Sequence, residues 1–187
     1  MKTYKFGIIA PCFENNEHSS GLDWNTRFRL IAAVNLLKRK RIETIIVGGG
    51  KLREMKESFS ELMKKYLIKR GVSAGLIGTE QYTYDTASQI FWVSKSINTM
   101  DDPTCFITDS AQANHIKALI KGFKIGECDV ISMEEINDYD YSMFIMKVRN
   151  SFGWVLFEAR ELLLFLFTIV FDPRNEFLGR ISIKRRT

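Results

Sequence analysis

Acidic residues in this sequence lie at predicted strand ends and helix starts, where a fold would gather them for chemistry. Glu61, Glu80, Asp85 and Asp109 are the four carboxylates in such positions. Carboxylates clustered at a cleft can act as general acid and base or hold a divalent ion. We predict Glu61, Glu80 and Asp85 as catalytic groups. Glu61, Asp85 and Asp109 have a simpler alternative, because an acidic residue at the start of a helix caps it or complements its dipole.

Three consecutive glycines end a β-branched run, in the stretch VGGG at residues 47–50. A Walker A loop would need a glycine at Ile45, and a dinucleotide-binding fingerprint would need one at Arg53. Neither phosphate motif fits. The sequence therefore predicts a strand end whose backbone amides face an anion, with a plain tight turn as the alternative.

Apolar runs and helical periods alternate along the chain. The predicted strands cover residues 4–10, 44–48, 76–79, 105–108 and 129–132. The predicted helices cover 24–38, a stripe at 59–67 that ends by Gly71, 86–97, a stripe at 116–123, and 154–171. This order predicts a three-layer α/β/α Rossmann-like sandwich, with a mostly parallel five-stranded sheet and a long C-terminal helix. We expect one domain, with a core at 1–150 and a helix and basic tail at 151–187.

Ligands of open parallel sheets bind beyond the carboxyl ends of the strands, next to helix N-termini. The residues predicted at that edge, besides the carboxylates, are polar or small. They are Cys12, Gly48, Gly49, Gly50, Ser60, Thr83, Thr86, Thr108 and Ser110. Asp109 belongs to the same group of ligand-binding candidates. Ser60 is also the predicted N-cap of its helix.

Composition excludes some classes of function. Three dispersed cysteines without a CxxC pair, and only two histidines, argue against a structural zinc site and favour reduced thiols in a cytoplasmic protein. Cys12 is a weak candidate nucleophile, and His115 is predicted on a helix surface. The net charge of +5 comes from dispersed basic residues, so we do not expect a nucleic-acid partner.

The most apolar run of the chain covers residues 162–171. It is shorter than the roughly 20 residues that span a bilayer, so no transmembrane segment is predicted and a buried helix is the first interpretation. A peripheral membrane contact and a subunit interface of a homo-oligomer are the alternatives. The N-terminus has too short an apolar run for a signal peptide.

The order of these motifs resembles the DUF218 (YdcF-like) family. The segments that carry the resemblance extend from Ile8 to about Phe167. They are Arg29-Leu30, VGGG at 47–50, Ser60-Glu61-Leu62-Met63, Gly71-Val72, Glu80, Thr83-Tyr84-Asp85-Thr86, Thr108-Asp109-Ser110-Ala111-Gln112 and Ala159-Arg160-Glu161. The sequence departs from the family pattern at the first loop, which is Ala10-Pro11-Cys12, at Ser88-Gln89, and at Gln112 and His115, where the family has histidine and arginine.

The resemblance implies a Rossmann-like sandwich with a polar cleft to which Arg29 and Gln112 contribute. It leads us to expect an enzyme, a transferase or hydrolase, that binds a phosphorylated or nucleotide-like small molecule. S-adenosylmethionine and a divalent cation are the cofactors left open. Because Gln112 replaces the family's histidine, a non-catalytic ligand-binding or regulatory module is an alternative. An interaction protein that uses the apolar C-terminal helix is another.

Overall fold

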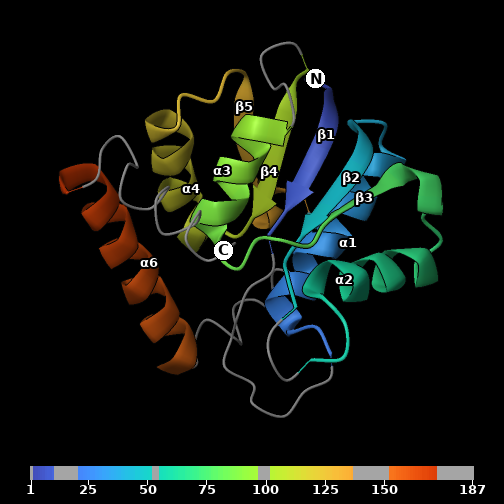
Figure 1. Cartoon of the computed structure of the whole chain (residues 1–187), viewed down its shortest axis with the longest axis horizontal. Helices are drawn as coiled ribbons and strands as arrows, with labels where there is room; N and C mark the ends of the chain where they lie inside the picture. Colours follow the sequence, from blue (N-terminus) through green and yellow to red (C-terminus); the bar gives the residue numbers. More distant parts are fainter. Residues whose placement is uncertain (1, 11–20, 52–54, 97–101, 137–151, 172–187) are drawn as a thin grey trace.

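The computed structural model describes residues 2–10, 21–51, 55–96, 102–136 and 152–171 (Figure 1). The predicted ligand-binding residue Cys12 lies outside these ranges. So does most of the basic tail.

A five-stranded sheet forms the centre of the molecule. Its strands are β1 (Tyr4–Ile9), β2 (Ile42–Gly48), β3 (Ile77–Glu80), β4 (Thr104–Thr108) and β5 (Cys128–Ser132). They lie in the order β3-β2-β1-β4-β5, and every neighbouring pair is parallel. The sequence prediction of a parallel five-stranded α/β fold is confirmed.

Helices lie between successive strands, as parallel pairing requires. They are α1 (Trp24–Lys38), α2 (Phe59–Lys69), α3 (Thr86–Ser96) and α4 (Ser110–Gly122), with the short 3-10 turn η1 (Ala74–Leu76) before β3. The 3-10 turn η2 (Met133–Glu135) and the helix α6 (Phe152–Val170) follow β5. The helices α1 and α2 cover one face of the sheet, and α3 and α4 cover the other (Figure 1).

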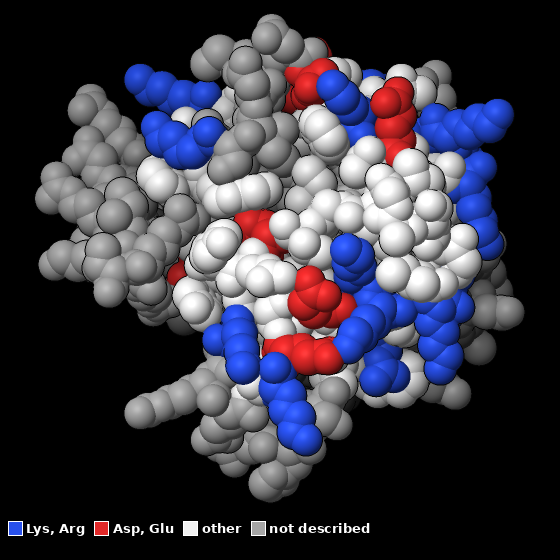
Figure 2. All heavy atoms as spheres, turned by 45° about the vertical axis from the view of Figure 1, so that its right-hand side comes forward, with Lys and Arg blue, Asp and Glu red and all other residues white. Residues whose placement is uncertain are grey.

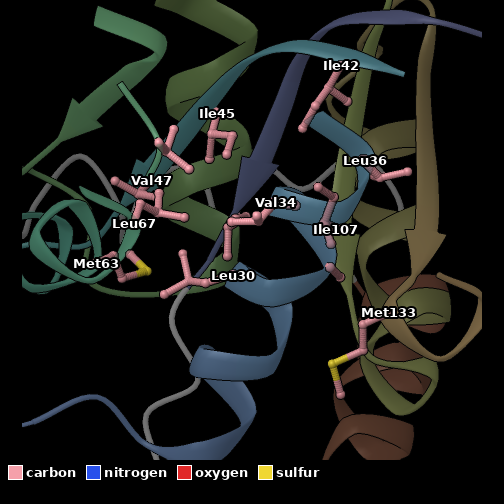
Figure 3. Close-up of a cluster of buried hydrophobic side chains, with 14 of the residues drawn as sticks. Leu30, Val34, Leu36, Ile42, Ile45, Val47, Met63, Leu67, Ile107 and Met133 are labelled. Atoms are coloured by element: carbon pink, nitrogen blue, oxygen red, sulfur yellow. The ribbon is translucent and has the colours of Figure 1, made fainter. Parts of the chain in front are cut away.

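Consecutive residues of the central strands supply the two cores, because side chains of a strand alternate between its faces. Ile9 and Val47 pack in one cluster with residues of α1 and α2, such as Leu30. Figure 3 shows this cluster, with α1 and α2 side chains directed at the sheet. Ile8 and Ile46 pack in the second cluster with residues of α3 and α4. Unbroken apolar strands are therefore the signature of a sheet buried on both faces.

The chain changes direction across the sheet between β1 and β4. From β1 it proceeds through α1 and α2 to β3 at one edge, and α3 then returns it to β4 on the other side of β1. The carboxyl ends of β1 and β4 therefore form the topological switch point, where open α/β sheets bind their ligands.

The C-terminal helix differs from the prediction. It packs beside α4, and its contacts with the rest of the domain are made mainly there. Most of its large apolar side chains are exposed, so the interpretation of 162–171 as a buried helix is wrong. Among the described helices, none is both long enough and apolar enough to cross a membrane.

Charge is distributed over the surface without one dominant patch in the view of Figure 2. Lysine and arginine side chains lie at several separate places on that face, with acidic side chains between them.

Candidate functional site

The carboxyl edge of the sheet consists of two neighbouring groups of residues. The first, at the ends of β2 and β3 and the start of α2, we call the glycine half: Gly48, Gly49, Gly50, Glu61, Glu80 and Thr83. The second, around the ends of β1, β4 and β5, we call the switch half: Arg29, Gln89, Thr108, Asp109, Ser110, Gln112 and Glu134. The two halves differ in how their polar groups are bonded.

In the glycine half, the backbone groups of the glycine loop bond to the protein itself. The Gly49 amide donates to the Glu80 carbonyl at 3.0 Å, and the Gly50 amide donates to the Thr83 carbonyl at 2.6 Å. The carbonyls of Gly49 and Gly50 accept from the first amides of α2, at Ser60 and Phe59. The two loop amides predicted to face an anion are thus engaged in joining β2, the loop after β3, and α2.

Glycine is required in this loop for conformation and for close approach. Gly49 has a φ of 134°, a backbone conformation that residues with a side chain rarely adopt. A Cβ at Gly48 would lie 2.0 Å from Nε2 of Gln89, and a Cβ at Gly50 would lie 2.8 Å from Cε1 of Tyr84. The alternative of a structural turn accounts for all three glycines in terms of protein contacts.

Glu80 is buried and bonds locally. Its carboxylate accepts hydrogen bonds from the Tyr82 amide and the Thr83 hydroxyl. These bonds shape the loop between β3 and α3. Thr83 itself is buried, so its hydroxyl is committed to Glu80.

The start of α2 corrects one prediction. Ser58, not Ser60, is its N-cap, and the Ser58 hydroxyl accepts from the Glu61 amide at 3.2 Å. Ser60 is buried, with its hydroxyl 3.0 Å from that of Ser58. Glu61 lies in the first turn, as predicted, and its carboxylate accepts from Gln81 Nε2 at 2.8 Å on the surface.

Asp85 acts as an N-terminal cap of α3. Its carboxylate accepts from the Ser88 amide at 2.6 Å, and the Ser88 hydroxyl accepts in turn from the amides of Tyr84 and Asp85. The capping alternative therefore describes the contacts of Asp85 well. Glu61, Glu80 and Asp85 each bond to different neighbours, and the described residues include no group of three His, Cys, Asp or Glu side chains placed to hold a metal ion.

In the switch half, a buried ion pair joins β1, α1 and β4. Arg29 of α1 is fully buried, and its guanidinium donates to the Ala10 carbonyl at 2.9 Å and to the Asp109 carboxylate. Asp109 also caps α4 by accepting from the Gln112 amide at 2.8 Å. A buried charge needs a partner of opposite sign, so each of the two side chains stabilises the other at the switch point.

Gln112 links β4 to α3. Its Oε1 accepts from the Thr108 hydroxyl at 3.0 Å, and its Nε2 donates to the Thr86 hydroxyl at 3.1 Å. The structure thus brings together three predicted ligand-binding residues, Thr86, Thr108 and Gln112, in one chain of hydrogen bonds. The amide of Gln112 has no titratable proton, so this position offers no general acid or base.

Glu134 of η2, which sequence reasoning did not select, lies against the start of α4. Its carboxylate accepts from the Ser110 amide at 3.1 Å and the Ser110 hydroxyl at 3.1 Å, and also from the Ser132 hydroxyl. A carboxylate is favourable there because the N-terminus of a helix carries partial positive charge. Its position two residues beyond the end of β5 was the available signal, since the same reasoning had located the other edge residues.

Gln89 is the second residue that sequence reasoning did not select for the site. It is 2% exposed, and its Nε2 donates to the Ile9 carbonyl at 3.0 Å. Because a carbonyl can only accept, this bond fixes which end of the amide carries the nitrogen. Its Oε1 is buried and accepts no hydrogen bond from the described part of the chain. A buried acceptor in this state calls for an explanation, since it loses its bonds to water on folding.

The thiols described by the structure are poorly suited to nucleophilic chemistry. Burial raises the pKa of Cys105 to about 12 and that of Cys128 to about 12. Because the thiolate is the nucleophile, both cysteines are almost wholly protonated near neutral pH. Neither adds a catalytic group to the edge.

His115 lies away from the carboxyl edge and is not on the surface, so that prediction is wrong. It is buried between α4 and α6, with Nδ1 3.2 Å from Oε2 of Glu161, which is buried as well. The Ala159-Arg160-Glu161 segment thus contributes to the attachment of α6, through Glu161.

Comparison with models of protein families, with curated proteins and with solved structures finds no match to this chain.

Proposed function

We propose that this protein is an enzyme, a transferase or hydrolase, that binds a phosphorylated or nucleotide-like small molecule at the carboxyl edge of the sheet. The observation that carries the proposal is Gln89, a buried side chain at the edge whose amide is fixed by the Ile9 carbonyl and whose Oε1 has no described donor. It lies next to the end of β1, at the switch point where this class of sheet binds ligands.

The contacts sharpen which part of the ligand would be recognised there. Gln89 offers an acceptor, so it suits a hydroxyl or amino donor, such as those of a sugar or a nucleobase. The amides of Gly49, Gly50 and Ser110 already bond to carbonyl or carboxylate oxygens of the protein. In this proposal the recognised group is therefore the donor-bearing part of the ligand.

Glu61 is the acid–base candidate that the proposal favours. Its carboxylate is partly exposed and bonds to the exposed Gln81 side chain, whereas Glu80 and Asp85 accept bonds that shape a loop and a helix start. In the same proposal, the cofactor is S-adenosylmethionine or a divalent cation, and the chain is a member of the DUF218 family.

A thermal-shift panel on the whole chain tests the binding step. The probes are nucleotides, S-adenosylmethionine, sugar phosphates and divalent ions, each added to the wild type and to Gln89→Met. We expect one probe class to raise the unfolding midpoint, since a ligand at 100 times its dissociation constant stabilises by about 2.7 kcal/mol. The same probe should fail to raise the midpoint of Gln89→Met, which keeps the volume of the side chain and removes its acceptor together with the donor to the Ile9 carbonyl.

Tyr4→Phe is the matched control, because it removes the 2.9 Å hydrogen bond to Asp129 at the opposite edge of the sheet. It should lower the midpoint and keep the full ligand response. A panel without any response, or an equal response in Gln89→Met, would contradict the proposal.

A non-catalytic binding module is the second candidate, and Gln112 favours it. Both ends of its amide are bonded within the protein, and a glutamine cannot transfer a proton. Gln112→His restores the residue that the resemblance places here. Gain of turnover in this variant, with a wild type that binds the same probe without turnover, would support the module.

A further inference from the structure

The helix α6 carries polar residues inside and apolar residues outside. Among the residues of α6 whose side chains the structure describes, Glu161, which meets His115 of α4, and Thr168 are buried. Thirteen large hydrophobic side chains are exposed in the described part of the chain, and nine of them belong to this helix and the residue after it. These nine are Val155, Leu156, Leu162, Leu163, Leu166, Phe167, Ile169, Val170 and Phe171. A contiguous exposed apolar surface of this kind marks an interaction site.

The width of this surface helps to identify what covers it. At about 100° per residue, the nine positions spread over about 200° of the helix circumference. A helix that packs on one neighbouring element needs an apolar stripe of about 100°. One protein partner would thus leave much of the surface in water, whereas lipid surrounds a helix on every side that the domain does not occupy.

The polar groups of the stretch are compatible with an apolar medium. Residues 162–171 include no charged side chain and one hydroxyl, that of Thr168, which donates to the Leu164 carbonyl at 2.8 Å. The stretch is helical up to Val170, so its interior backbone groups bond within the helix. Nothing in this segment requires water.

The length of the stretch 162–171 and the charged residues around it are consistent with insertion into one leaflet of a membrane. The nine helical residues of the stretch rise about 14 Å, which is nearly half of the roughly 30 Å hydrocarbon core. Glu158, the exposed Arg160 and the buried Glu161 precede the stretch. The sequence of residues 172–187 follows it with five Lys and Arg against two Asp and Glu, a net charge of +3. Basic residues next to an apolar helix favour the surface of an anionic bilayer.

We infer that residues 162–171 enter the apolar part of one leaflet of an anionic membrane and hold the α/β domain at its surface. The inference is independent of the ligand site, since α6 packs on α4 and contributes none of the residues of either half of the carboxyl edge. The contact of Glu161 with His115 would then set the orientation of the domain relative to the bilayer.

Flotation of the whole chain with lipid vesicles tests the inference. The probes are vesicles of phosphatidylcholine alone and vesicles with equal parts of phosphatidylcholine and phosphatidylglycerol. We expect the wild type to float with the anionic vesicles and to bind less to the neutral ones. The variant Leu163→Glu with Val170→Glu should bind at least about tenfold less, because it places two charges in the stretch that enters the lipid.

The matched control is Ile68→Glu with Leu76→Glu, which makes the same charge change at exposed apolar residues of α2 and η1. This control should float like the wild type, and circular dichroism should show that both variants remain folded. Equal flotation of the two variants would overturn the inference. So would a wild type that binds no vesicles and sediments without lipid as a dimer, if the α6 variant alone dissociates that dimer.

Discussion

The two halves of the carboxyl edge contain similar residue types, but their polar groups are bonded differently. In the glycine half, Glu80, the loop glycines and the first amides of α2 form hydrogen bonds with one another and with the loop after β3. The switch half contains a buried ion pair and a buried acceptor, Gln89 Oε1, with no described donor. A glycine-rich strand end can thus be a structural joint, while the neighbouring switch half contains the buried acceptor on which the proposed function rests.

The largest test of this comparison removes the cation of the switch half. Arg29→Met would leave the fully buried Asp109 without its partner, and loss of one member of a buried pair costs about 3–5 kcal/mol. Urea denaturation measures the loss. The control Arg70→Met removes an exposed guanidinium bonded to the Tyr66 hydroxyl, and should change stability by less than about 0.5 kcal/mol. Equal losses in the two variants would mean that the ion pair adds nothing to the switch point.

A smaller effect tests whether the two halves meet at Gly48. Gly48→Ala places a Cβ 2.0 Å from Gln89 Nε2, so the Gln89 side chain must move and its bond to the Ile9 carbonyl is disturbed. We expect a loss of about 1–3 kcal/mol, as for overpacking elsewhere. In a Gln89→Ala background the same substitution should cost much less, and a double-mutant cycle measures this coupling. Additive losses would show that the glycine serves the loop and not its neighbour.

The smallest effect sharpens the role of the glycine half in chemistry. Glu61→Gln should change the free energy of unfolding by less than about 0.5 kcal/mol, because its side chain bonds Gln81 on the surface. Glu80→Gln should cost about 1–3 kcal/mol, since this buried carboxylate accepts two hydrogen bonds. Chemical denaturation compares the two. If Glu61→Gln lowers the free energy of unfolding as much as Glu80→Gln does, both carboxylates are structural and neither is available for acid–base chemistry.

The fold was accessible from sequence because its signals are local and repeated. Apolar runs such as those of β2 and β4 and the stripe of α2 each report one element, and their alternation indicates parallel pairing. The edge residues followed from the same topology. Partners were less accessible: Arg29 and Asp109 are 80 residues apart, and so are Gln89 and Ile9. No local pattern reports such contacts.

The errors have a common physical origin. His115 was placed on the surface by the polarity of its side chain, yet it is buried because it meets the buried Glu161. Leu163 and its neighbours were placed inside because they are apolar, yet they are exposed on a helix that contacts one neighbour. Polarity predicts burial on average, and it fails where a buried polar pair or an uncovered apolar surface occurs.

The Arg29–Asp109 pair also constrains the order in which the chain can fold. Before β4 is in place, Arg29 lacks its counter-ion, so packing α1 on the sheet would bury an uncompensated charge. The cost of burying that charge is recovered only when β4 docks beside β1, after closure of a loop of about 80 residues. A fragment that ends before β4 should therefore fail to complete its core, and the domain should gain its stability in one cooperative step at the arrival of the fourth strand.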